Sequence, residues 1–115
     1  MLVTGPLGTT AGRFVLDTGA VLTTMTHELA DLVGYSARDA IRRARVRTAI
    51  SSEEGYLLRV AELAVLGFAM PSFAINVFDL GFDDIDGLVG MNFLSELNYE
   101  VRSAEQRILT EKIGP

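Results

Sequence analysis

The stretch Phe14-Val15-Leu16-Asp17-Thr18-Gly19-Ala20 decides which fold this sequence predicts. Three apolar residues lead directly into an acid, a hydroxyl and a glycine. A carboxylate at the end of an apolar run needs hydrogen-bond partners, or it gives up its charge. Thr18 can hydrogen-bond to a neighbouring loop, and Gly19 permits a turn that a side chain would block. The stretch therefore predicts a strand that presents one acid at a fixed position. Taken alone, it fits an ordinary strand and turn equally well.

Composition restricts the class of protein. The chain has 115 residues, of which 49% are hydrophobic and 22% charged, as is typical of a globular protein. This length predicts a single domain over residues 1–115 with one core. The net charge of −5 argues against nonspecific nucleic-acid binding, which needs a positive surface. No apolar run approaches the length of a transmembrane helix, so we expect no membrane segment.

Chemistry that depends on cysteine or on several histidines is excluded, because the chain has no Cys and one His. His27 lies in no nucleophile motif, and we expect it on the surface in the first turn of a helix. The acids between Asp79 and Asp86 lack the spacing of a calcium-binding loop. We therefore expect no metal and no cofactor. No signal peptide is visible, so we expect a cytoplasmic protein or a domain excised from a longer one.

The periodicity of apolar residues predicts a mostly β chain with two or three short helices. One helix should begin after Thr26 and end at Gly34. Residues 37–44 fit a short helix or a helical turn, and Asn92 is positioned to cap another helix through residue 97. Strands are expected at residues 1–6, 13–16, 20–25, 46–50, 56–66 and 73–77, with turns at 8–12, 51–55 and 67–72. A closing hairpin is expected at residues 99–102 and 107–110.

Five arginines lie between Arg38 and Arg47. An acidic partner is one explanation for this cluster. The other, which we favour, is a solvated face on which Arg43 pairs with Asp39 four residues earlier.

A second stretch, D-G-L-V-G-M-N-F-L at residues 86–94, makes a functional interpretation of the first stretch more specific. The combination of F-V-L-D-T-G-A, a hairpin in mid-chain and this apolar-apolar-Gly stretch resembles the retropepsin-like (retroviral-type) aspartic proteases, as a single-domain bacterial-type member. The resemblance covers essentially the whole chain. It implies a closed, β-barrel-like acid-protease fold in which the D-T-G loop lies beside the strand at residues 88–90. The mid-chain hairpin would then be the flap.

The resemblance also implies a site. Asp17 would be the catalytic acid, within an active-site loop formed with Thr18, Gly19 and Ala20. Substrate would contact the flap and the cleft through Ile50, Ser51, Ser52, Leu88 and Val89, with Gly90 as a structural residue beside the site.

The number of acids has a consequence for assembly. Aspartic protease chemistry needs two carboxylates that share one proton. The chain has one D-T-G, and Asp86-Gly87 lacks the intervening hydroxyl residue. A homodimer would supply Asp17 twice. We therefore expect a homodimeric aspartic endopeptidase that cleaves extended polypeptides with apolar side chains at the scissile bond.

The flap leaves an alternative open. Its expected tip carries two serines and two glutamates, with Gly55 as the single glycine. A flap that does not close would give a weak or inactive retropepsin-like module for dimerisation or peptide binding. The sequence also leaves two candidates for the dimer interface, the N-terminal strand and the strand at residues 107–110.

Overall fold

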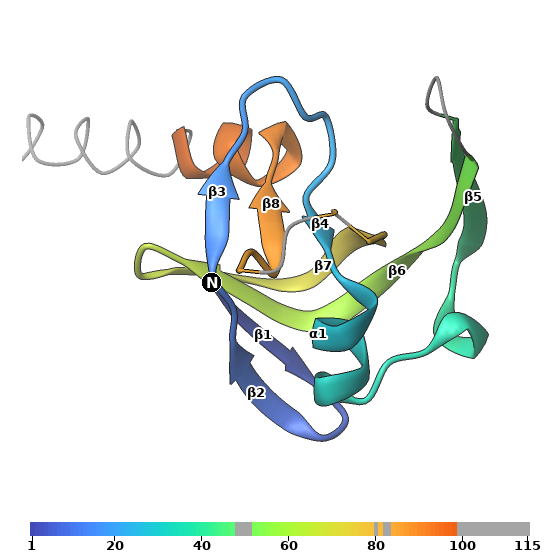
Figure 1. The fold of residues 1–115 in the computed structure, drawn as a ribbon. Helices are drawn as coiled ribbons and strands as arrows, with labels where there is room; N and C mark the ends of the chain where they lie inside the picture. Colours follow the sequence, from blue (N-terminus) through green and yellow to red (C-terminus); the bar gives the residue numbers. More distant parts are fainter. Residues whose placement is uncertain (48–51, 80, 82–83, 99–115) are drawn as a thin grey trace, which may run out of the picture.

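The computed structural model describes residues 1–47, 52–79, 81 and 84–98. It is mostly β, and its strands form one eight-stranded sheet that curls like half a barrel (Figure 1). The strand order is β2-β1-β6-β7-β4-β8-β3, and β5 pairs with β6 off this path. The strands are β1 (Leu2–Gly5), β2 (Gly8–Ala11), β3 (Phe14–Leu16), β4 (Thr24–Met25), β5 (Arg42–Arg47), β6 (Ser52–Val65), β7 (Phe68–Val77) and β8 (Gly87–Val89).

Two of the expected turns are strands instead. Residues 8–12 were expected to turn, yet β2 begins at Gly8 and pairs with β1. Residues 67–72 were also expected to turn, yet β7 begins at Phe68. Both connections are tight: Leu66 and Gly67 take φ values of 53° and 84°, so two residues complete the β6–β7 hairpin. The glycine and proline residues in these two segments therefore led to predicted turns that are longer than the turns in the structure.

The mid-chain hairpin is longer than expected. β5 and β6 pair from Arg42 with Leu57 to Arg47 with Ser52, so the turn expected at residues 51–55 is wrong for 52–55. Gly55 lies within β6, paired with Ala44. A larger residue would not fit there, because a Cβ would collide with the Phe78 ring and the carbonyl of Val77. The hairpin projects from the body of the sheet (Figure 1). Its tip, including the expected contacts Ile50 and Ser51, lies outside the described residues.

The helix expected after Thr26 is confirmed as α1 (His27–Val33). The Thr26 hydroxyl accepts a hydrogen bond from the Leu29 N–H, and Gly34 ends the helix with φ 94°. The following segment forms one 3-10 turn, η1 (Ala37–Asp39), and then enters β5. The expected Arg43–Asp39 pair is therefore absent among the described residues; Arg45 pairs instead with Glu54 across the hairpin at 2.8 Å.

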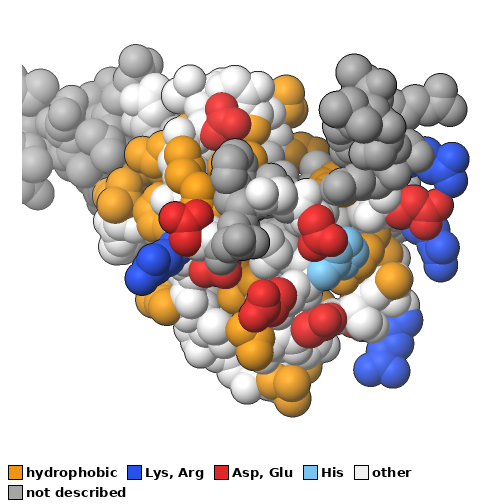
Figure 2. Space-filling view, viewed as in Figure 1, with side chains coloured by type: hydrophobic (Ala, Val, Ile, Leu, Met, Phe, Trp, Pro, Cys, Tyr) orange, Lys and Arg blue, Asp and Glu red, His pale blue; other side chains and the backbone are white. Residues whose placement is uncertain are grey.

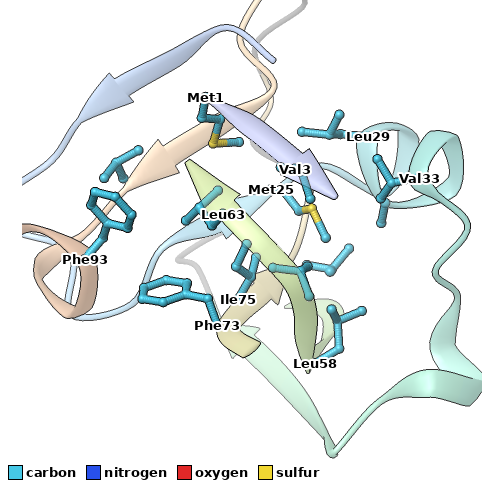
Figure 3. Packing of buried hydrophobic residues seen from close by; sticks show 14 of the residues in the cluster. Met1, Val3, Met25, Leu29, Val33, Leu58, Leu63, Phe73, Ile75 and Phe93 are labelled. Atoms are coloured by element: carbon cyan, nitrogen blue, oxygen red, sulfur yellow. The ribbon is translucent and has the colours of Figure 1, made fainter. Parts of the chain in front are cut away.

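The core lies on one face of the curled sheet, under α1 and under residues 91–98, which are helical (Figure 3). Along β6, Leu58 and Val60 are buried, whereas Leu57 and Arg59 lie on the opposite face. Burying one such side chain contributes about 1.5–3 kcal/mol. The largest fully buried side chains are Phe93, Met25, Leu29, Leu58, Leu63, Ile75, Val3, Val33, Val60, Val65, Val77 and Val89.

Candidate active site

Asp17 follows β3, the edge strand of the sheet, and is held by backbone hydrogen bonds. β3 runs parallel to β8, with Leu16 opposite Val89. The Asp17 N–H donates to the Val89 carbonyl at 2.9 Å, and the Gly19 N–H donates to Asp17 Oδ1 at 3.0 Å. The carboxylate is half-buried and its orientation is fixed by its own loop. The expectation that this loop lies beside residues 88–90 is confirmed.

The rest of the loop joins the start of the helical segment at residues 91–98. The Ala20 carbonyl accepts a hydrogen bond from the Met91 N–H at 2.7 Å, and the Val21 carbonyl accepts one from Asn92 at 3.0 Å. Gly90 makes this approach possible, because a Cβ at this position would lie 2.7–2.8 Å from backbone atoms of Leu22 and Ala20. Gly90 is therefore structural, as expected. Thr18 and Gly19 are exposed at the tip of the loop.

A buried polar network behind the loop was missed by sequence reasoning. Asn92 Oδ1 accepts hydrogen bonds from both the N–H and the hydroxyl of Thr23, each at 2.8 Å. Asn92 Nδ2 donates to the Ala74 carbonyl at 3.0 Å, and the Gly90 N–H donates to the Thr23 hydroxyl at 3.1 Å. Thr23 is fully buried. Asn92 was expected to cap a helix, but its side chain instead ties the active-site loop to β7.

Four side chains from different strands lie in one row on the face opposite the core. Val15 pairs with Leu88, Leu88 with Thr24, and Thr24 with Asn76. Directly paired residues project from the same face of a sheet. The next residues in register, Met25 and Val77, are fully buried on the other face. We call Val15, Leu88, Thr24 and Asn76 the cleft floor, after the substrate cleft that the family resemblance implies.

Asp17 belongs to the same face. It follows Val15 by two residues, and side chains two apart along a strand project to the same side. Leu88, which is expected to contact substrate, is half-buried in this row. The same expectation is wrong for Val89, because its side chain is fully buried in the core. Val89 serves the site through its carbonyl, which accepts the Asp17 N–H.

This geometry agrees with comparisons to known proteins. The family model described as gag-polyprotein putative aspartyl protease matches residues 3–96. The chain belongs to this family of retropepsin-like aspartic proteases. A retropepsin-like aspartic protease from Rickettsia conorii has the same fold, with a TM-score of 0.62 and 23% identity over 83% of this chain and 77% of that chain. No curated protein sequence matches. Family and fold together support protease activity.

The acid of the D-G-L-V-G stretch, Asp86, is engaged elsewhere in the structure. Asp86 Oδ2 accepts a hydrogen bond from the Arg13 N–H at 2.9 Å, at the start of β3. Asp17 follows Arg13 by four residues, which along an extended strand separates the two acids by roughly 13 Å. Asp86 therefore fixes the entry of β3 and is too far from Asp17 to share a proton with it.

A cavity of about 510 Å³ lies elsewhere in the structure, between α1, η1 and the base of the β5–β6 hairpin. It is lined by His27, Asp31, Ser36, Ala37, Arg43, Arg45, Glu54, Gly55 and Tyr56. Tyr56 projects from the core side of β6, opposite Leu57, and the cavity contains neither Asp17 nor any cleft-floor residue. Its size suits a ligand, but its position does not suit cleavage by Asp17.

The structure places His27 in the lining of that cavity, where its ring packs against the ring of Tyr56. His27 is in the first turn of α1 as expected, and its ring lies 5.7 Å from that of Tyr56. Burial raises the pKa of Tyr56, and the charges of Asp31 and Asp39 raise it further. His27 therefore packs against the base of the β5–β6 hairpin and does not line the same site as Asp17. Within the described ranges, no group of three or more His, Asp or Glu side chains could hold a metal ion, and no helix could cross a membrane.

Proposed function

We propose that this chain is a homodimeric aspartic endopeptidase whose catalytic pair consists of Asp17 from each protomer. The observation that carries the proposal is the placement of Asp17, a single acid fixed by Gly19 and Val89 on the binding face of an edge strand. The two carboxylates share one proton. The charged one takes a proton from a water molecule, and the other gives its proton to the carbonyl oxygen of the peptide that the water attacks.

The need for a second copy follows from the distances between acids. The other acid of the family stretch, Asp86, is committed to Arg13 at the far end of β3. A symmetric dimer brings the same surface of both protomers together, so a residue near the axis meets its own copy. Asp17 is suited to such a position because it follows an edge strand and precedes an exposed loop.

Apolar side chains near Asp17 support the same assembly. Leu16 is 49% exposed, Val21 76% and Met91 37%. We call these three residues the apolar rim. Figure 2 shows hydrophobic side chains gathered over β3. Exposed apolar surface around a site commonly marks a protein contact. A second protomer that covers the apolar rim would also shield the two carboxylates from bulk water.

Substrate would lie on the cleft floor as an extended chain, between Asp17 and the flap hairpin formed by β5 and β6. Of the floor residues, Val15 lies on β3, the strand that leads to Asp17, and Leu88 lies beside it on β8. They would contact the apolar side chains that flank the scissile bond. Ser52 begins β6 at the inner edge of the flap tip, opposite Arg47.

The test is cleavage by the Asp17→Asn variant. Asparagine preserves the shape of the side chain but cannot act as the base, so cleavage of a peptide with two apolar residues at the scissile bond should be lost. Sedimentation should meanwhile show an unchanged dimer. Equal cleavage by Asp17→Asn would exclude the mechanism, and a monomer at every concentration would exclude the composite site.

A second function is favoured by the construction of the flap. Its single glycine, Gly55, is packed under Phe78, and Arg45 and Glu54 pair across the two strands. A hairpin built in this way is stiffer than one with a glycine-rich tip. A stiff flap suits a module that binds peptides or dimerises with little turnover. This function predicts peptide binding that Asp17→Asn leaves intact, together with no cleavage by the unmodified chain.

A further inference from the structure

The cleft floor is apolar at one end and polar at the other. Val15 and Leu88, on β3 and β8, are hydrocarbon side chains. Thr24 and Asn76, on the next two strands, carry a hydroxyl and a carboxamide. Both polar residues are half-buried, and neither side chain hydrogen-bonds to another residue in the described part of the chain. The other asparagine of this region, Asn92, is in contrast fully engaged with Thr23 and Ala74.

The position of the polar pair can be placed relative to the scissile bond. Neighbouring strands are about 4.8 Å apart, so β4 and β7 lie roughly 10 and 14 Å from β3. An extended peptide that crosses the floor advances about 3.3 Å per residue. Thr24 and Asn76 would therefore lie under substrate side chains roughly three to four residues from the scissile bond. Because a homodimer has two such floors, this holds on both sides of the bond.

Covering this pair has an energetic consequence. A bound substrate displaces water from the Thr24 hydroxyl and the Asn76 carboxamide. An apolar substrate side chain would leave them without partners, which costs more than a hydrogen bond gains. A charged substrate side chain would also bind weakly here, because no residue of opposite charge belongs to the cleft floor. Arg42 is the nearest in register, but it lies on β5 beyond Leu57.

We propose that Thr24 and Asn76 form a polar subsite that selects an uncharged hydrogen-bonding side chain, a carboxamide or a hydroxyl, beside the apolar scissile pair. The inference rests on the proposed function, because it takes the cleft floor as the substrate site. It narrows the expected substrate from a generally apolar segment to one with two apolar residues at the scissile bond and, roughly three to four positions away, a residue of the glutamine, asparagine, serine or threonine type.

The experiment compares peptides that differ at one residue. Each keeps the same apolar pair at the scissile bond, and the second, third and fourth positions on either side carry, in turn, glutamine, leucine, glutamate or lysine. At one of these positions we expect kcat/KM for glutamine to exceed that for leucine by about tenfold, the value of one or two hydrogen bonds. Equal rates, or a preference for leucine, would overturn the subsite. A preference for glutamate would overturn its uncharged character and point to Arg42.

Two variants that preserve side-chain shape test whether Thr24 and Asn76 cause the preference for glutamine. Thr24→Val and Asn76→Leu should each reduce the glutamine preference, and the double variant should prefer leucine. Leu66→Asn, on the exposed β6–β7 turn, is the control and should leave the preference unchanged. If the double variant keeps the preference for glutamine, another part of the cleft provides it and the inference is wrong.

A binding measurement separates this inference from the proposed function. Fluorescence anisotropy of labelled peptides on the Asp17→Asn variant requires no turnover. Selective binding of the glutamine peptide supports the subsite if the selectivity is lost when Asp17→Asn is combined with Asn76→Leu. This conclusion holds even if the unmodified chain cleaves no peptide. In that case only the endopeptidase proposal fails. Cleavage without discrimination between peptides overturns the subsite alone. Absence of binding in both variants overturns both.

Discussion

Replacing Asn92 with leucine should destabilise the fold strongly, because Asn92 joins three segments that meet behind Asp17. Its Oδ1 accepts two hydrogen bonds from Thr23, and its Nδ2 donates one to the Ala74 carbonyl. Three neutral hydrogen bonds contribute about 3 kcal/mol. Thr23 is fully buried, so no water can replace its lost partner, and the unmade bonds add to the cost. We expect the free energy of unfolding to fall by about 3–5 kcal/mol, a large share of the total for a small domain.

The assay is urea denaturation of the variant beside a matched control. Asn76→Leu makes the same change at another half-buried asparagine, one that hydrogen-bonds to no described side chain. It should cost less than about 1 kcal/mol. Asn92→Asp keeps the acceptor for Thr23 but loses the donor to Ala74, so an intermediate loss is expected. If Asn92→Leu costs no more than Asn76→Leu, the network does not stabilise the active-site loop and the reasoning is refuted.

Three further outcomes test other parts of the structure. Gly90→Ala should lower stability by about 2–3 kcal/mol in thermal denaturation, because the added Cβ displaces backbone of the active-site loop; a change below about 0.5 kcal/mol would contradict that packing. Tyr56 should ionise above the ordinary value of 10.0 in an ultraviolet titration, and Asp31→Asn should bring its pKa down. Since folding favours the neutral phenol, its contribution to stability is full below pH 10.0 and is lost as pH rises through the raised pKa; a titration unchanged by Asp31→Asn would count against this. Val21→Asp should give a folded monomer, whereas Leu66→Asp, at another well-exposed position, should stay dimeric; a dimer that survives Val21→Asp would exclude the apolar rim as its interface.

The sequence was sufficient for features that depend on local chemistry. Thr26 and Gly34 are good helix boundaries because a hydroxyl and a left-handed glycine satisfy helix ends wherever they occur. The alternation along residues 73–77 predicted a strand in the same way. Asp17 and its loop were identified because D-T-G-A at residues 17–20 occurs together with D-G-L-V-G-M-N-F-L at residues 86–94, a combination that resembles a known family, whereas the first stretch alone fits an ordinary turn equally well.

Features that depend on contacts distant in sequence were missed. Gly55 was assigned to a turn, yet it lies in β6, where glycine is needed because Phe78 occupies the space of a side chain. Asn92 was read as a helix cap, and its true partner, Thr23, is separated from it by 69 residues. The cleft floor is a further case, since its four members lie on four strands. Only the register shows that Leu88 faces the floor while Val89 faces the core.

The central claim is that each protomer supplies half of one catalytic pair, and mixed dimers test it most directly. Unmodified chain and Asp17→Asn are mixed in equal amounts, the protomers are allowed to exchange, and cleavage is measured at constant total protein. If a dimer needs both carboxylates, about one quarter of the dimers, and hence of the activity, remains. If each chain works alone, about one half remains. A residual activity near one quarter is the predicted result, and a value near one half would contradict the account.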